Sequence, residues 1–144
     1  MNVPAALAIA REAHSGQLDK AGEPYVGHPQ RVAERVSHLG DRAVLAAVLH
    51  DVLEDTDLSA ADLLARGVPP AVIHTVQILS RGAGETYDQF IGRIGQCGDP
   101  IAVAVKLADI ADNLDEDRLG RLPPEEAERL RRKYGAARRK LTAG

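Results

Sequence analysis

Ala46-Ala47-Val48-Leu49-His50-Asp51-Val52-Leu53-Glu54-Asp55-Thr56 is the stretch that decides the fold of this chain and points to its chemistry. Its apolar residues predict a helix buried in the core, yet the stretch also carries a histidine and three carboxylates. Burying carboxylates without partners is costly, so a cation is expected beside them. A divalent metal ion meets this need most simply.

The polar residues of this stretch share one side of the predicted helix. The histidine and the three carboxylates are His50, Asp51, Glu54 and Asp55. At about 100° per residue, these four lie within an arc of about 140° and can face one cavity. They also crowd the C-terminal end of the helix, where the macrodipole disfavours each acid by up to ~1 kcal/mol. A second interpretation fits a bare His-Asp pair, with His50 as a hydrogen-bonded core histidine and the carboxylates as a solvated helix end.

Length and composition predict one domain over residues 1–144, because 144 residues with 44% hydrophobic side chains can bury a core. A net charge of −3 and only four Phe or Tyr side chains argue against a nucleic-acid partner. The sequence contains no secretory or membrane-spanning segment, so we expect a cytoplasmic protein without a membrane partner. Its single cysteine, Cys97, excludes an internal disulfide and is expected to be a small buried residue. Nothing in the sequence specifies an oligomeric state.

Apolar residues at helical spacing predict an all-α fold. The expected helices cover residues 3–14, 29–39, 42–55, 59–66, 70–81, 86–96, 99–115 and 123–141. Glycines or prolines mark most ends of these ranges, and Ser59 with Asp62 is typical of a helix N-cap. The basic residues near the C-terminus alternate with glutamates, which is typical of the solvated face of a terminal helix.

His28 is a candidate for a further metal ligand beside His50 and Asp51. It directly precedes Pro29, a residue that suits the first turn of a helix, at the end of the long irregular segment 16–29. A set of histidine nitrogens and carboxylate oxygens suits Mn²⁺, Fe²⁺ or Zn²⁺. A surface position in the loop is the alternative for His28. His14, His38 and His74 are assigned no role at the metal.

A further carboxylate is expected in the helix over 99–115. Asp109 and Asn113 are four residues apart and share a face that apolar residues continue. Asp112 lies to one side of that face and is the weaker ligand candidate. The open alternative is that Lys106, Asp109 and Asn113 form an ordinary solvated stripe.

Several motifs, in order along the chain from about Ala10 to Tyr134, resemble the HD-superfamily hydrolase domain of the RelA/SpoT alarmone enzymes, and most of all the stand-alone small alarmone hydrolases. The motifs are AHSGQ at 13–17, KAGEPY at 20–25, HP at 28–29, VA at 32–33, LHDVLEDT at 49–56 and VKLAD at 105–109.

This resemblance implies an all-α, HD-domain helical bundle of about seven to eight helices. It implies one Mn²⁺ ion, with Fe²⁺ or Zn²⁺ as alternatives, held by His28, His50, Asp51 and Asp109. It assigns Glu54 and Asp55 to positioning and activating the attacking water, and Lys20 and Asn113 to the nucleotide. Tyr134, with Tyr87 and Arg81, is expected to line the pocket, with packing or surface roles as the alternative.

The implied reaction is hydrolytic removal of the 3′-pyrophosphate from guanosine 3′,5′-bis(diphosphate), ppGpp, or its pentaphosphate form, giving GDP or GTP. Two departures from the family pattern bear on the nucleotide: Asp19 stands where an arginine usually stacks on guanine, and Ile110 replaces a basic residue. Two alternatives therefore stay open. One is hydrolysis of another phosphorylated nucleotide, such as the 2′-phosphate of NADPH, and the other is a non-catalytic nucleotide sensor.

Overall fold

The computed structural model describes residues 1–18, 22–25 and 27–143, and in these ranges the chain is helical, as predicted. The elements are α1 (Val3–Ala13), α2 (Gly27–Arg35), the 3-10 turn η1 (Ser37–Leu39), α3 (Asp41–Leu49), α4 (Val52–Asp55), α5 (Ala60–Ala65), α6 (Pro70–Ile78), α7 (Tyr87–Gln96), α8 (Pro100–Asn113), α9 (Glu116–Leu119) and α10 (Pro124–Thr142). Within the described residues, Leu18 and Pro24 form an isolated antiparallel β-bridge. None of the described helices has both the length and the apolar composition that crossing a membrane requires.

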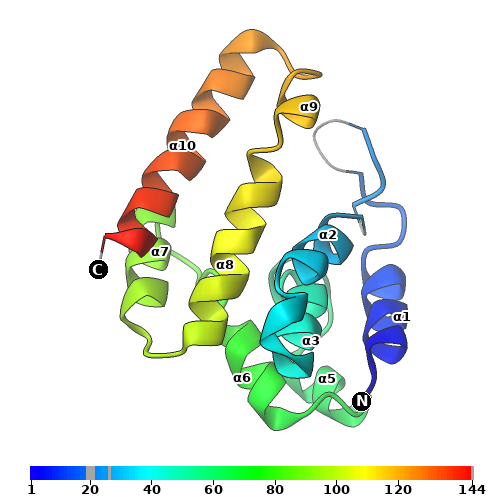
Figure 1. Cartoon of the computed structure of the whole chain (residues 1–144). Coiled ribbons are helices and arrows are strands. Elements are labelled where there is room, and N and C mark those ends of the chain that lie inside the picture. Colours follow the sequence, from blue (N-terminus) through cyan, green and yellow to red (C-terminus); the bar gives the residue numbers. More distant parts are fainter. Residues whose placement is uncertain (19–21, 26, 144) are drawn as a thin grey trace.

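α3 is the central helix of the fold. It packs against α1, α2, α6 and α8, so it has little contact with solvent. Ala46, Ala47 and Leu49 are fully buried in it, which explains why this segment is built from small and branched apolar residues. Figure 1 shows α3 and α2 between α1 on one side and α8 on the other.

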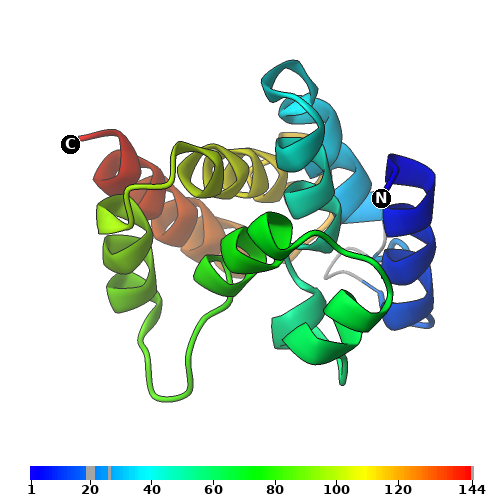
Figure 2. The same cartoon turned by 90° about the horizontal axis from the view of Figure 1, so that it is seen from below.

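α7, α8 and α10 form a second group of helices beside the first. α10 packs against both α7 and α8, and Figure 2 shows the three together at the side of the molecule that carries the C-terminus. A small apolar cluster of Leu119, Ala127 and Leu130 joins α9 to α10. α8 contacts α2 and α3 on one side and α10 on the other, so it connects the two groups.

Local capping fixes several helix starts that the sequence indicated. Ser59 accepts a hydrogen bond from Asp62 N and the Asp62 carboxylate accepts one from Ser59 N, which confirms the predicted cap as a full capping box. At the end of α1, Gly16 has a φ of +79°, a conformation that glycine adopts without strain and that turns the chain into the loop toward α2.

Two predicted helices are each divided in the structure, and one short helix is additional. The helix expected over 29–39 is split into α2 and η1, and the one expected over 42–55 is split into α3 and α4 at His50-Asp51. The short helix α9 was not predicted. Cys97, expected to be buried, is half-buried after α7. On α10 the basic residues Arg129 and Arg132 are exposed, in agreement with a solvated face.

Candidate metal centre

Three separate elements bring the four predicted metal ligands together. His28 comes from α2, His50 and Asp51 from the junction of α3 and α4, and Asp109 from α8. One potential ligand atom of each lies within 4.8 Å of the others. Asp109 Oδ1 is 2.6 Å from His28 Nε2 and 3.1 Å from His50 Nε2, and Asp51 Oδ2 is 3.2 Å from His50 Nε2.

The split between α3 and α4 is what lets two neighbouring residues face the same point. Consecutive residues of a regular helix point about 100° apart. Here His50 N bonds to Ala47 O, three residues back, before regular bonding resumes from Asp55 N to Asp51 O. This tightened turn directs the side chains of both His50 and Asp51 into the cluster.

Both imidazole rings are oriented by an acceptor at Nδ1. His50 Nδ1 donates to Ala47 O at 2.6 Å, and His28 Nδ1 donates to Asp112 Oδ2 at 2.6 Å. The backbone carbonyl can only accept, and an ionised carboxylate likewise only accepts, so Nδ1 carries the proton in each ring. Each Nε2 is therefore turned toward Asp109, which is the arrangement that metal-binding histidines adopt.

The donor set fits a divalent transition metal. It combines two imidazole nitrogens with two carboxylates, and His28, His50 and Asp109 are each no more than 5% exposed. The alternative in which Lys106 and Asp109 belong to a solvated stripe is excluded, because both side chains are buried.

Opposite charges in the cluster stabilise one another when no cation is present. Burial alone would lower the pKa of His28, but its hydrogen bonds to Asp109 and Asp112 outweigh burial and raise that pKa to about 9. Burial would raise the pKa of Asp109, but Lys106 and the two histidines hold it well below its usual value. A proton on the histidines therefore balances the carboxylates, and a metal ion would replace it.

Side chains around the cluster hold its carboxylates in place. Tyr25 OH donates to Asp51 Oδ2 at 2.5 Å and lies 3.4 Å from Asp55 Oδ2. Lys106 Nζ donates to Asp109 Oδ2 at 2.7 Å, leaving Oδ1 toward the histidines. Burial beside Asp51 raises the pKa of the Tyr25 hydroxyl above its usual value, so Tyr25 acts as a donor.

Glu54 and Asp55 lie one turn beyond the histidine, on α4, at the exposed edge of the cluster. Both line a cavity of about 360 Å³ that also reaches Asp51 and Asp109. Partial burial and then the charge of Asp51 raise the pKa of Glu54 and that of Asp55. A carboxylate with a raised pKa can accept a proton more readily.

The cavity has a cationic part and an apolar part. Its cationic lining residues are Arg31, Arg81, Lys106, Arg118 and Lys133. Its apolar lining residues are Leu18, Phe90, Leu119, Leu122 and Leu130. Such a mixture suits a ligand that carries both phosphate groups and a flat or apolar part.

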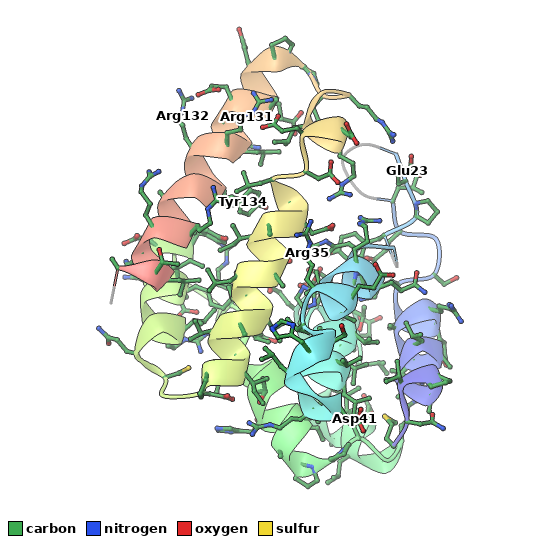
Figure 3. The ribbon with its side chains drawn as sticks, in the orientation of Figure 1. Glu23, Arg35, Asp41, Arg131, Arg132 and Tyr134 are labelled. Atoms are coloured by element: carbon green, nitrogen blue, oxygen red, sulfur yellow. The ribbon has the colours of Figure 1, made fainter. Side chains whose placement is uncertain are left out.

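The predicted substrate residues divide between described and undescribed parts of the chain. Asn113 lines the cavity, and its Nδ2 lies 3.5 Å from Asp109 Oδ1. Tyr134 also lines the cavity, and Figure 3 shows it directed from α10 toward α8, whereas Arg132 points outward. Lys20 and Asp19 lie outside the described residues.

Sequence reasoning missed the residues that orient the ligands. Helical spacing indicates Asp112 only as the weaker ligand candidate, and Tyr25 stands in the sequence only as part of the KAGEPY motif. His14, which was assigned no role, is buried and donates from Nδ1 to Gln17 Oε1 at 3.1 Å, while Gln17 Nε2 donates to Asp55 O. The spacing of these residues along the chain gives no sign of such contacts, since Tyr25 and Asp51 are 26 residues apart.

Comparisons with known sequences give a matching family model and several curated relatives. Residues 6–85 match the family model described as HD domain. The chain is 34% identical over 134 residues to the guanosine-3′,5′-bis(diphosphate) 3′-pyrophosphohydrolase of Haemophilus influenzae, covering 85% of this chain and 19% of that protein. It is 32% identical over 139 residues to the bifunctional (p)ppGpp synthase/hydrolase SpoT of Escherichia coli, covering 88% and 19%. The chain thus spans less than a fifth of the length of these curated relatives.

Solved structures share the fold. A metazoan ortholog of SpoT that hydrolyses ppGpp superposes with a TM-score of 0.81 at 25% identity, covering 97% of this chain and 85% of the other. A Listeria monocytogenes protein superposes with a TM-score of 0.60 at 23% identity, covering 82% of each chain, and shows similarity of fold alone.

Proposed function

Because the chain belongs to the HD-domain family, we propose that it is a metal-dependent phosphohydrolase that removes the 3′-pyrophosphate of ppGpp, giving GDP and pyrophosphate. The pentaphosphate form would give GTP. We propose Mn²⁺ as the ion and the cytoplasm as the location of the reaction. The observation that carries the proposal is the convergence of His28, His50, Asp51 and Asp109 at a cavity with a cationic lining.

In this proposal the four clustered residues hold one divalent ion. When bound there, the ion would lower the pKa of the attacking water and offset charge on the phosphoryl group. Glu54, on the turn after His50, is the candidate to accept the proton of that water, and Asp55 the candidate to orient it. Tyr25 keeps Asp51 directed into the cluster.

We propose that the cavity lining recognises the substrate. Asn113 and Tyr134 are the candidates to contact the nucleotide. Lys20, which lies outside the described residues, is the candidate to meet its phosphates. Cationic side chains at the rim, among them Arg81, can meet a second phosphate group on the same nucleotide. Ile110 is fully buried in the apolar core and does not line the cavity, so it takes no part in this recognition.

A nucleotide panel tests the proposal. Purified protein with Mn²⁺ is incubated with ppGpp, pppGpp, NADPH and GDP, and the products are separated by anion-exchange chromatography. We expect GDP and GTP with release of pyrophosphate from the first two, and no turnover of GDP. If NADPH loses its 2′-phosphate while ppGpp stays intact, NADPH rather than ppGpp is the substrate. Tight binding of ppGpp without pyrophosphate release would instead identify a nucleotide sensor.

A further inference from the structure

Asp112 is a buried carboxylate that the proposed hydrolysis does not use. It lies near the end of α8, three residues after Asp109, and is 1% exposed. A buried carboxylate is costly unless its oxygens accept hydrogen bonds. Asp112 has such partners on three sides, and they come from two other elements of the fold.

The first partner is a proposed metal ligand. His28 Nδ1 donates to Asp112 Oδ2 at 2.6 Å, while Nε2 of the same ring faces Asp109. The two nitrogens of His28 therefore connect two carboxylates of α8. A proton held on Nδ1 leaves the lone pair of Nε2 available to a metal ion.

The other partners are two arginines that hold Asp112 in place. Arg31 Nε donates to Asp112 Oδ1 at 2.9 Å, and Arg31 follows His28 by three residues on the same face of α2. Arg118 Nη2 lies 3.1 Å from Asp112 Oδ2 and also donates to the backbone carbonyl of Asp112. Both oxygens of the carboxylate therefore receive donors, and its plane is fixed relative to the imidazole ring.

His50 offers a useful contrast within the same cluster. Its Nδ1 donates to the neutral backbone carbonyl of Ala47, so its orientation is set by the helix itself. The orientation of His28, which follows a long loop, depends on a charged side chain. A carboxylate acceptor also makes the opposite nitrogen a better donor to a metal than a carbonyl acceptor does.

We propose that Asp112, held by Arg31 and Arg118, is a positioning residue that fixes the Nδ1–H tautomer of His28 and strengthens metal binding through its Nε2. The inference rests on the metal site of the proposed function. Asp112 would contact neither the ion nor the substrate. Replacing Asp112 by asparagine would force an amide N–H₂ toward one of three donors, so at least one of these contacts would be lost.

Metal binding by Asp112→Asn and by a matched control tests this role. Asp115→Asn is the control, because Asp115 follows on the same segment and pairs with Arg118 at 3.5 Å, while its Oδ1 bonds to Asp117 N rather than to His28. Binding of Mn²⁺ alone is followed by the loss of the free-ion EPR signal, and circular dichroism checks the fold. We expect Asp112→Asn to weaken Mn²⁺ binding by about 10–100-fold and Asp115→Asn to change it by less than about 2-fold. Equal binding by Asp112→Asn and wild type, or equal losses in the two variants, would overturn the proposal.

A measurement on the wild-type protein decides the matter even if Asp112→Asn does not fold. In protein loaded with diamagnetic Zn²⁺, ¹⁵N NMR of the imidazole rings reports which nitrogen carries the proton. We expect a proton on His28 Nδ1, shifted downfield by its bond to a carboxylate, and the metal on Nε2. A proton on Nε2 would overturn the proposal. Wild-type protein that binds neither ion would overturn the proposed function as well, whereas unchanged binding in the variant would overturn only the role of Asp112.

Discussion

At the scale of single residues, the proposed function assigns the metal ion and the attacking water to different carboxylates. Asp51 is directed into the cluster, where its Oδ2 lies 3.2 Å from His50 Nε2 and accepts from Tyr25. Glu54 lies on the next turn at the exposed edge of the cavity. The first is therefore expected to determine metal binding, and the second to determine turnover.

Substituting these two carboxylates should separate the two roles. Asp51→Asn should abolish Mn²⁺ binding and hydrolysis together, while helicity by circular dichroism is kept. Glu54→Gln should retain Mn²⁺ and lower kcat by about 10²–10⁴-fold, because a proton acceptor is lost. Mn²⁺ titration and steady-state kinetics check both variants.

Asp57→Asn is the control for this pair, since Asp57 is an exposed carboxylate just after α4 and does not line the cavity. It should behave as wild type. Loss of the metal in Glu54→Gln, with metal retained in Asp51→Asn, would show that the two roles are exchanged.

The residues that form the cluster are predicted from the sequence, but the contacts that support them are not. His50 and Asp51 stand out because charged groups interrupt an apolar segment, and His28 and Asp109 join them through the order of the motifs. The role proposed for Asp112 depends on its contact with His28, which lies 84 residues earlier in the sequence. Such a contact is set by how α2 packs against α8, which local spacing does not encode.

At the scale of elements, the division of residues 42–55 into α3 and α4 is the main departure from expectation. Helical periodicity predicts where apolar residues recur, but one tightened turn leaves that pattern almost unchanged. The sequence therefore predicted the buried segment and the polar residues that follow it, and missed the turn that aligns His50 with Asp51. Helix starts were better predicted because caps such as Ser59 are local signals.

The central position of α3 makes its last apolar residue a sensitive site. Leu49 is fully buried next to His50, whereas Leu64 on α5 is 55% exposed. Leu49→Ala should lower the free energy of unfolding by about 2–5 kcal/mol, because a cavity forms in the core. Leu64→Ala should change it by less than about 0.5 kcal/mol. Urea denaturation measures both, and similar values for the two variants would contradict the central role of α3.

At the scale of the whole molecule, the site is formed where two groups of helices meet. α2 and α3 supply the histidines, α8 supplies Asp109, and α10 supplies Tyr134 to the opposite wall of the cavity. Folding therefore brings like charges together, and protons on the histidines balance them when no metal is bound. Stability, protonation and metal binding are linked for this reason.

This linkage predicts a pH dependence with a defined sign. The pKa of His28 is raised from 6.5 to about 9 in the metal-free fold, so its contribution to stability is complete below pH 6.5. That contribution, on the order of 3 kcal/mol, is lost as the pH rises through about 9. Metal binding requires the neutral ring, so Mn²⁺ should bind more tightly toward the alkaline end of this window and release a proton.

Thermal unfolding with and without Mn²⁺, under anaerobic conditions at both ends of the window, checks this prediction. The rise in Tm caused by a fixed Mn²⁺ concentration should be larger at the alkaline end. A rise that does not change with pH would contradict the linkage between His28 protonation and metal binding.

The most direct test of the metal centre is a crystal structure of the Mn²⁺-loaded protein with anomalous data collected at the manganese edge. One strong anomalous peak is expected within bonding distance of His28 Nε2, His50 Nε2 and the carboxylates of Asp51 and Asp109. A map with no peak among these four side chains, despite saturating Mn²⁺, would contradict the account.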